Sequence, residues 1–313
     1  MKSTHAILAF VLVSSITSSS FAVEGGLGRP ISGAAINPYA GLVPPEPGFA
    51  VTVGEVYYDG SISGNVPLGN FNIALGFDMV ASFTPIGISY IWPTSSERWN
   101  FASAISLPLA YVQVTANATL GRVSVNKTES DFGLFDIAFV PLVASYHISK
   151  TDHVALNLTI WAPSGDYDPN RLATLSLNNW TFIPGIAYTK IFSKENIEFT
   201  GIWQLQFYTE NHATDYQNGV LSDFELTIIK RFKCGAGIGV IGGGIEQLSD
   251  DSGPTADRFH GFSGRAFGVG PILTYTRKIG KGLLDLNARF IPEFGNENRV
   301  QGNLFQFAAT LKF

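Results

Sequence analysis

One stretch of this 313-residue chain decides the fold: residues 196–208 read NIEFTGIWQLQFY. Its odd-numbered positions are apolar or small, and most even-numbered positions between them are polar; the two sets are Ile197, Phe199, Gly201, Trp203, Leu205 and Phe207, and Asn196, Glu198, Thr200, Gln204 and Gln206. A period of two is that of a β-strand, because successive side chains point to opposite faces. An apolar face backed by a polar one predicts a strand with lipid on one side and a barrel interior on the other.

The same alternation recurs along the chain. Residues 223–233 place Phe224, Leu226, Ile228 and Phe232 on one face and Asp223, Glu225, Thr227, Arg231 and Lys233 on the other. Residues 284–290 set Leu284, Leu286, Ala288 and Phe290 against Asp285, Asn287 and Arg289. Several amphipathic strands in one chain predict an all-β fold, an antiparallel transmembrane β-barrel.

The composition supports a membrane-spanning barrel over membrane-spanning helices. The chain is 45% hydrophobic but only 14% charged, against roughly 25% charged residues in a typical soluble domain. After the first 22 residues there is no uninterrupted apolar run long enough for a helical span; the nearest, Phe71 to Trp92, contains Asn72, Asp78 and Pro85. A barrel spreads its apolar residues over alternating positions instead.

The lengths of the connections predict about twelve strands. Counting back from a periplasmic C-terminus, the long polar connections lie near 292–301, 249–263, 210–221, 164–179 and 117–132, and the short ones near 279–280, 234, 193–194 and 149–152. Long outer loops alternating with short periplasmic turns are typical of these barrels. Two further strands fit near 49–58 and within 71–92, where a short interior helix could precede the strand.

The N-terminal region divides into two parts. Residues 1–22 combine an early lysine, an apolar run and a small-residue end at Ala22, which predicts a cleaved signal peptide and export to the outer membrane of a Gram-negative bacterium. Residues 23–48 are rich in glycine and proline, so they form either a loose periplasmic arm or a plug in the lumen; the plug is favoured because Ile31, Ile36, Tyr39 and Leu42 suit free water poorly. The barrel then covers residues 49–313.

The last strand ends on Phe313 after alternating apolar residues. A terminal phenylalanine on an amphipathic strand resembles the signal by which the outer-membrane assembly machinery recognises its clients. That machinery, the membrane lipid and lipopolysaccharide are therefore the expected partners, together with a small hydrophobic ligand.

Signals of catalysis or cofactor binding are missing from the sequence. The histidines lack metal-ligand spacing, there is no G-x-S-x-G motif, and Cys234 is the only cysteine. We therefore expect no enzymatic activity, no cofactor and no metal, and a net charge of −5 gives no indication of nucleic-acid binding.

Short motifs resemble the family of the MetA pathway of phenol degradation, whose members include sphingosine-induced and aromatic-catabolism-linked outer-membrane proteins. The matching stretches are Gly41 to Gly48, Phe135-Asp136-Ile137 with Pro141-Leu142, Ala162 to Tyr167, Asn179 to Phe182, Asn211 with Thr214, Tyr216 and Gly219, and Gly270-Pro271 with Tyr275. The resemblance covers nearly all of the chain beyond residue 22 and implies an outer-membrane barrel that passes small hydrophobic or aromatic molecules.

The leading expectation is an outer-membrane channel for passive uptake of such compounds. Candidate residues on its path are Asp166, Tyr167, Trp180, Asn211, Thr214 and Tyr216, whose rings could stack on an aromatic solute and whose polar groups could bind a hydroxyl. Their alternative role is structural: closing the outer loops and, for Trp180, marking the membrane interface.

Two other functions remain open from the sequence. The side chains expected to face the lumen are Glu198, Gln204, Asp223, Glu225, Arg231, Asp285 and Arg289. Opposed charges would suit a non-selective pore for small polar solutes. The same charges, if paired with each other, would close the barrel and leave a surface binding protein.

Overall fold

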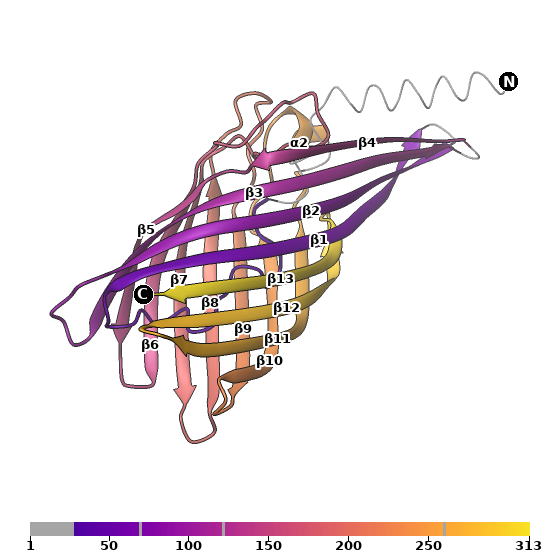
Figure 1. The fold of residues 1–313 in the computed structure, drawn as a ribbon. Helices are drawn as coiled ribbons and strands as arrows, with labels where there is room; N and C mark the ends of the chain where they lie inside the picture. Colours follow the sequence, from indigo (N-terminus) through magenta and orange to yellow (C-terminus); the bar gives the residue numbers. More distant parts are fainter. Residues whose placement is uncertain (1–27, 69–70, 121–122, 259–260) are drawn as a thin grey trace.

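The computed structural model describes residues 28–313 except 69–70, 121–122 and 259–260, and the predicted signal at 1–22 lies outside this part. Thirteen antiparallel strands form one closed sheet (Figure 1). The strands and the one short helix are β1 (Gly48–Leu68), β2 (Phe71–Trp92), β3 (Trp99–Leu120), β4 (Val123–Leu134), β5 (Ala138–His147), β6 (Asp152–Trp161), β7 (Thr181–Phe192), β8 (Ile197–Tyr208), β9 (Leu221–Arg231), β10 (Ala236–Gln247), α2 (Pro254–Arg258), β11 (Arg265–Ile279), β12 (Gly282–Glu297) and β13 (Gln301–Lys312).

The predicted number of strands around the barrel is confirmed. Strand β1 pairs with β13 and closes the sheet. Strand β3 pairs with β2 along one edge. Along its other edge, the first half of β3, from Trp99 to Ser106, pairs with β5, and the second half, from Leu109 to Leu120, pairs with β4. Because β4 and β5 share this edge, the circumference holds twelve strands and β4 is the extra one.

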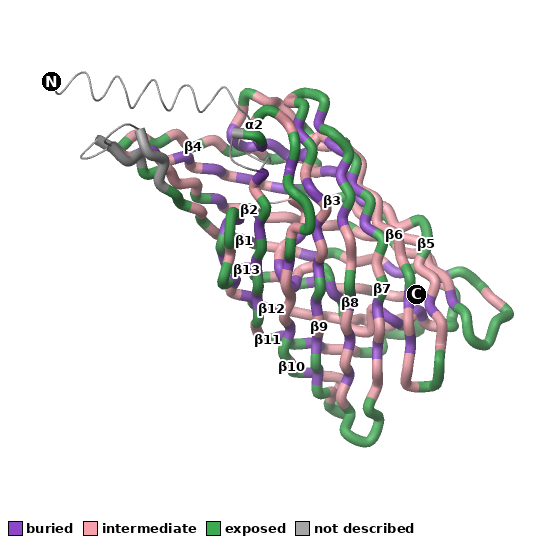
Figure 2. Tube along the Cα trace, turned by 180° about the vertical axis from the view of Figure 1, so that it is seen from behind, coloured by how far each residue is buried: buried purple, intermediate pink, exposed green. Residues whose placement is uncertain are grey.

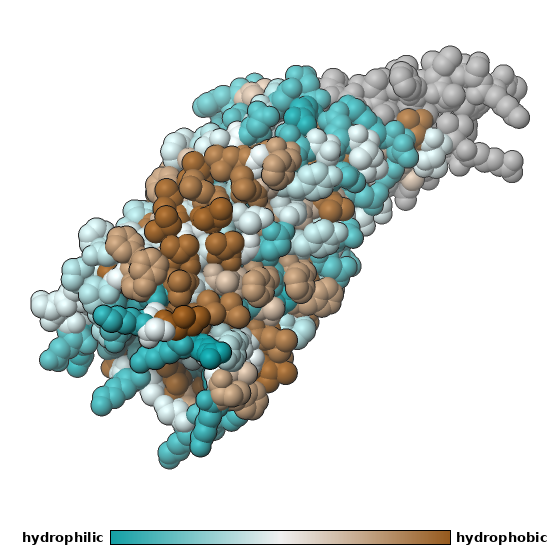
Figure 3. Space-filling model, viewed as in Figure 1, coloured by the Kyte–Doolittle hydropathy of each residue, from teal (hydrophilic) through white to brown (hydrophobic). Residues whose placement is uncertain are grey.

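Alternation along the strands places apolar side chains outside. On β8, Trp203 and Phe207 are 48% and 41% exposed, whereas Glu198 and Thr200 are buried. Figure 2 shows the same alternation of burial along the strands, and Figure 3 shows brown side chains gathered across the middle of one face with teal side chains at both ends. An apolar belt bounded by polar ends matches the hydrocarbon layer of a bilayer.

The first four strands are longer than the sequence predicted. Strand β1 continues to Leu68, and β2 is a strand over all 22 of its residues, so the short helix considered within 71–92 is wrong. The long loop expected at 117–132 is also wrong, because most of these residues belong to the β3–β4 hairpin. The last outer connection is shorter than the predicted 292–301, since β12 runs to Glu297.

These long strands project past the rest of the barrel as an arm, defined here by residues 62–68, 71–77, 116–120 and 123–127 (Figure 1). The pairing of β1 with β13 ends at Ser61, whereas its pairing with β2 continues to Leu68. The outward face around the arm carries hydrogen-bonded polar pairs such as Thr115 with Thr128 at 2.9 Å. Polar side chains replace apolar ones there because this part lies beyond the lipid.

In the described part of the chain, no helix has the length and apolar character needed to cross a membrane.

Candidate functional site

Residues 28–44 run along the inside of the barrel and contact its inner wall, and we call this segment the plug (Figure 1). Its backbone is bonded to charged side chains of the wall. Glu225 accepts the amides of Ala35 and Ile36 at 3.3 and 2.7 Å, and Glu198 accepts the amide of Tyr39 at 2.7 Å. Arg289 Nη1 donates to the carbonyls of Gly33 and Ile36 at 3.0 and 2.6 Å. The wall thus satisfies backbone groups that a plug without secondary structure would leave unpaired.

The next part of the plug runs along β7 and β5, beside the strand that carries Glu198. Gly41 donates its amide to Thr189 at 3.0 Å and accepts from the Ser145 hydroxyl at 2.8 Å. A Cβ at Gly41 would lie 2.6 Å from the backbone nitrogen of Thr189, so only glycine allows this close approach. Asn100, at the beginning of β3, donates to the carbonyl of Val43 at 3.0 Å and fixes this end of the plug to the wall.

All seven side chains expected in the lumen lie on the inward face of their strands. Besides holding the plug, Glu198 forms an ion pair with Arg231, and Asp285 accepts a bond from Thr276 at 2.6 Å. Asp223 and Gln204 are cross-strand neighbours on β9 and β8. Glu198, Glu225, Arg231 and Arg289 are therefore bonded to the plug or to each other, whereas the buried carboxylate of Asp223 has no hydrogen-bond donor among the described residues.

Asp136 lies in the three-residue break between β4 and β5 and is fully buried. Its carboxylate accepts the amides of Ser164, Gly165 and Leu177 at 3.0, 3.0 and 3.1 Å and the hydroxyl of Ser176 at 2.6 Å. It also accepts the Arg29 guanidinium at 2.9 Å. One carboxylate therefore connects the barrel wall, the outer loop after β6 and the plug.

Arg29 is the residue of the plug that binds Asp136. Its Nε donates to Thr181 at 2.8 Å, and its guanidinium carbon lies 4.9 Å from the centre of the Trp161 ring. The Arg29 side chain is 3% exposed. Its guanidinium is thus held by a carboxylate, a hydroxyl and an aromatic face.

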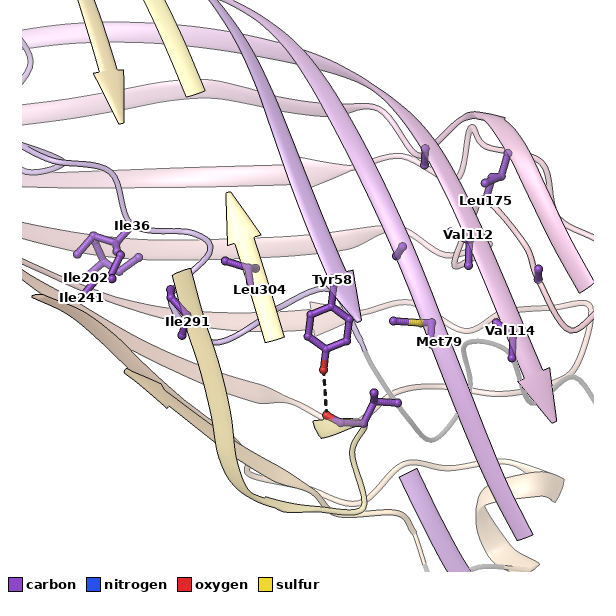
Figure 4. Close-up of a cluster of buried hydrophobic side chains, with 14 of the residues drawn as sticks. Ile36, Tyr58, Met79, Val112, Val114, Leu175, Ile202, Ile241, Ile291 and Leu304 are labelled. Carbon is purple, nitrogen blue, oxygen red and sulfur yellow. Dashed lines mark hydrogen bonds between the residues drawn. The ribbon is translucent and has the colours of Figure 1, made fainter. Parts of the chain in front are cut away.

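The loop at 162–180 is folded into the mouth of the barrel. Its residues from Leu172 to Leu177 are all buried, and Leu172 and Leu175 belong to the same apolar cluster as Val112 and Val114 of β3 (Figure 4). Arg171 donates to the carbonyl of Ser130 at 3.0 Å, along the edge of β4 that pairs with no described strand. The loop covers both this edge and the apolar inner wall.

The inner wall has two sides of different chemistry. Strands β8, β9 and β12 carry the inward charges, and on this side the plug packs so closely that Ile229, Ile241 and Ile291 are fully buried. Figure 4 shows Ile36 of the plug beside Ile202 and Ile241. Described inward positions of β2 and β3 carry no charged side chain, and many, such as Phe83 and Ala104, keep partial exposure.

Aromatic side chains gather next to the uncharged strands β2 and β3, and the Arg29 guanidinium of the plug lies over two of their rings. Phe83 and Phe135 meet edge to face with ring centres 5.1 Å apart, and Phe135 and Trp161 do so at 6.1 Å. All three keep partial exposure although they face the interior, which leaves a surface that an apolar solute could contact. We call these three residues the aromatic cluster.

The six residues expected at the mouth separate into different places. Asn211 donates to the Tyr167 hydroxyl at 2.8 Å, so these two meet. The Tyr216 hydroxyl donates to Asp251, and Thr214 lies in the same short turn, where its amide donates to the Asn211 carbonyl. Asp166 is exposed beside Arg171, and Trp180 is 42% exposed on the outer surface. The structure brings Tyr167, Asn211, Thr214 and Tyr216 into a braced loop cluster and leaves Asp166 and Trp180 outside it.

A shallow pocket of about 250 Å³ opens beside this loop cluster. It is lined by Phe207, Tyr208, Gln217, Asn218, Gly219, Val220, Ser249, Asp250 and Ser252. Gly219 is required there, because a Cβ would collide with the carbonyl oxygen of Ser249. Within the described residues, no group of three or more histidine, cysteine, aspartate or glutamate side chains is arranged to hold a metal ion.

Several functional positions escaped the sequence analysis. The connection between Arg29 and Asp136 joins residues 107 apart in sequence, which no local pattern shows. One signal was present: Leu172, Leu175 and Leu177 are poorly suited to a solvated loop. The aromatic cluster was hidden because alternation distinguishes the two faces of a strand but not which inward residues meet across the lumen.

The fold, the apolar belt and the plugged lumen define a bacterial outer-membrane β-barrel. A protein-family model described as "Putative MetA-pathway of phenol degradation" matches residues 69–309, and the chain belongs to that family. No curated protein matches the chain at a significant level.

The chain is similar to several solved structures, and one of them supports the fold. The COG4313 outer membrane channel from Pseudomonas putida F1 is similar with a TM-score of 0.66 and 15% identity, over 89% of this chain and 100% of that chain. A Pseudomonas aeruginosa FadL homologue aligns over 92% of this chain and 96% of its own, with a TM-score of 0.44 and 8% identity. The CymD monoaromatic hydrocarbon channel gives 0.42 and 8%, over 95% and 98% of the two chains.

Proposed function

We propose that this protein is a channel through which small apolar and aromatic compounds diffuse passively across the outer membrane. The observation that carries the proposal is the two-sided lumen: a charged side holds the plug, and an uncharged side presents the aromatic cluster and the apolar residues of β2 and β3. Contact with such a surface replaces unfavourable hydration of an apolar solute, so a concentration gradient is enough to drive passage.

The family description is consistent with this proposal, since compounds on a phenol-degradation pathway are small aromatics. Outer-membrane lipid surrounds the apolar belt. We further propose that the last strand presents Phe313 to the assembly machinery; in the folded barrel its amide donates to the Phe49 carbonyl at 2.9 Å, next to the barrel closure.

The path we propose begins at the mouth, beneath the loop at 162–180. A solute that displaces Leu172 to Leu177 would reach the inner wall around Val112 and then the aromatic cluster. Passage to the periplasm then requires the plug to move, because its residues from Tyr39 to Val43 cross the lumen from β8 to β3. The loop cluster around Tyr167 and Asn211 would act as the fixed side of the mouth.

A non-selective polar pore is less well supported by the geometry. Such a pore needs charged side chains facing water, whereas Glu198, Glu225 and Arg289 are bonded to the plug backbone and are almost completely buried.

The test is uptake of radiolabelled toluene by Gram-negative cells that express the protein in place of their own hydrophobic-compound channels. We expect Phe83→Asp to reduce protein-dependent uptake at least about tenfold, because a buried charge in the aromatic cluster repels an apolar solute. Phe132→Asp makes the same change on the outward face of β4, where Phe132 is 70% exposed, and should leave uptake intact. Equal uptake by cells with and without the wild-type protein would refute the proposal.

A further inference from the structure

We infer that the lumen wall around Asn157, near the aromatic cluster, binds aromatic compounds carrying a hydrogen-bond donor, and that Asn157 is the residue that selects for the donor. This inference rests on the proposed function and narrows its substrate class.

Asn157 lies on the inward face of β6, four residues from Trp161 of the aromatic cluster. Its side-chain oxygen Oδ1 is buried, and among the residues that the structure describes none supplies a hydrogen-bond donor to it. Its neighbours across the two adjacent strands are Val143 and Gly185, neither of which has a polar side chain. A buried amide oxygen without a donor is unfavourable, and native proteins nearly always satisfy it.

Gly185 makes room for the side chains on both sides of it. A Cβ at Gly185 would lie 2.9 Å from Asn157 Oδ1 and 3.0 Å from Cγ of Gln204 on β8. Both distances are tighter than ordinary contact, so any larger residue would press against Asn157 and Gln204. The glycine therefore allows the amide oxygen of Asn157 to lie close to the backbone of β7.

The row continues to a second acceptor. Asn157, Gly185, Gln204 and Asp223 are successive cross-strand partners on β6, β7, β8 and β9. Both carboxylate oxygens of Asp223 are buried and have no donor among the described residues. Unpaired oxygens therefore occur at Asn157 and at Asp223, on either side of Gln204 in this row. Each of them could accept a hydrogen bond from a ligand.

The apolar surroundings restrict what can carry that donor. Asn157 shares the inward face of β6 with Trp161, and Val143 beside it packs on the apolar cluster together with Phe83 and Phe135. A ring lying against Val143, the cross-strand neighbour of Asn157, could direct a single hydroxyl or amino group toward Oδ1. A hydrocarbon of the same shape would fit but would leave the oxygen unsatisfied.

The experiment compares phenol with toluene, which differ in one donor but are close in size. Equilibrium dialysis of the purified full-length barrel with each labelled compound gives two dissociation constants. We expect Asn157→Leu to lower the preference for phenol over toluene about tenfold, because it removes the acceptor and keeps the volume. Anisole, which accepts but cannot donate, should behave like toluene in both proteins.

Two further variants control the comparison. Asn303→Leu makes the same substitution on the exposed outward face of β13 and should leave the preference unchanged. Gly185→Ala keeps the amide but presses on its oxygen and displaces it, and should weaken phenol binding more than toluene binding. Each variant must also show the heat-dependent gel mobility of a folded barrel.

The outcomes separate this inference from the proposed function. An unchanged preference in Asn157→Leu, or an equal loss of both ligands, would overturn the role of Asn157 and leave the channel intact. Failure of the wild-type protein to bind either compound would instead contradict the proposed function itself.

Discussion

Asp136 shows how much one residue can organise in this barrel. Its carboxylate accepts five hydrogen bonds, four from the outer loop at 162–180 and one from the plug, and it is fully buried. Removing one partner of a buried ion pair leaves the other charge uncompensated, which costs more than an exposed pair contributes. We therefore regard the Arg29–Asp136 pair as the connection through which movement of the outer loop reaches the plug.

Asp136→Asn keeps the volume of this side chain but replaces an acceptor oxygen with a donor. We expect the free energy of unfolding to fall by about 3 kcal/mol, because Arg29 and the amides of Ser164 and Gly165 lose their anionic partner. Urea unfolding of the barrel in lipid vesicles measures this. The matched control is Asp166→Asn, whose carboxylate is exposed and 3.9 Å from Arg171; a loss as large as in Asp136→Asn would contradict our account.

We expect the stability of the outer loops to depend on pH through Asp251. Burial raises the pKa of its carboxyl group, while the bonds donated by Gly219 and Tyr216 act in the opposite direction. Because the pKa in the folded state is above that in the unfolded state, the stabilising contribution is fully present below the unfolded value of about 4 and is lost as the pH rises through the folded value.

We therefore expect acidification from neutral pH toward pH 4 to stabilise the wild type relative to Asp251→Asn, which cannot titrate. Thermal unfolding of both proteins at several pH values gives the comparison. Asp250→Asn, a change at the exposed neighbouring carboxyl, should follow the wild type. A stability difference between wild type and Asp251→Asn that does not vary with pH would show that Asp251 is not responsible.

Among the elements, the outer loop at 162–180 packs its apolar side chains into the apolar cluster of the barrel. Leu175 is 1% exposed and packs in the apolar cluster with residues of β3. We expect Leu175→Ala to destabilise this loop by about 3 kcal/mol, the usual cost of a buried leucine side chain. Limited proteolysis of intact cells should then cleave the loop faster than in the wild type.

Leu248→Ala removes a leucine that is 58% exposed in another outer connection and should leave cleavage unchanged. Equal rates for wild type and Leu175→Ala would mean that the loop is held by its polar contacts alone.

The elements that the sequence predicted well are those that cross the lipid. Strands β8, β9, β12 and β13 alternate because one face must be apolar and the other faces a polar interior, and their structural registers agree with that pattern. The arm could not be predicted in this way. Beyond Ser61 the outward face is polar, and the inward face contains Ile62 and Phe77. With the usual polarity reversed and many small polar residues, these segments look like loops.

The candidate site was predictable only in part, for a related reason. Alternation identified the lumen-facing charges, because each lies on a strand with a clear apolar face. It could not show that Glu225 and Arg289 would bond to the plug backbone, since such contacts depend on where an irregular segment lies. The polar loop motif at 211–219 suggested a ligand site, whereas its hydrogen bonds brace the loop.

At the scale of the whole molecule, we propose that the two sides of the lumen have different roles. In this proposal the charged side fixes the plug and limits the passage of ions and water, and the uncharged side offers a surface to apolar solutes. Arg289→Met should weaken the plug by removing two bonds to its carbonyls while keeping an unbranched side chain of similar length.

Planar-bilayer conductance of the refolded protein, recorded with and without a panel of aromatic solutes, tests this central claim most directly. We predict little steady ionic current through the wild type, a current increased several-fold in Arg289→Met, and a response of the wild type to aromatic solutes that Phe83→Asp abolishes. A steady open current through the wild type, the same in the presence and absence of every solute, would show a general pore and contradict the account.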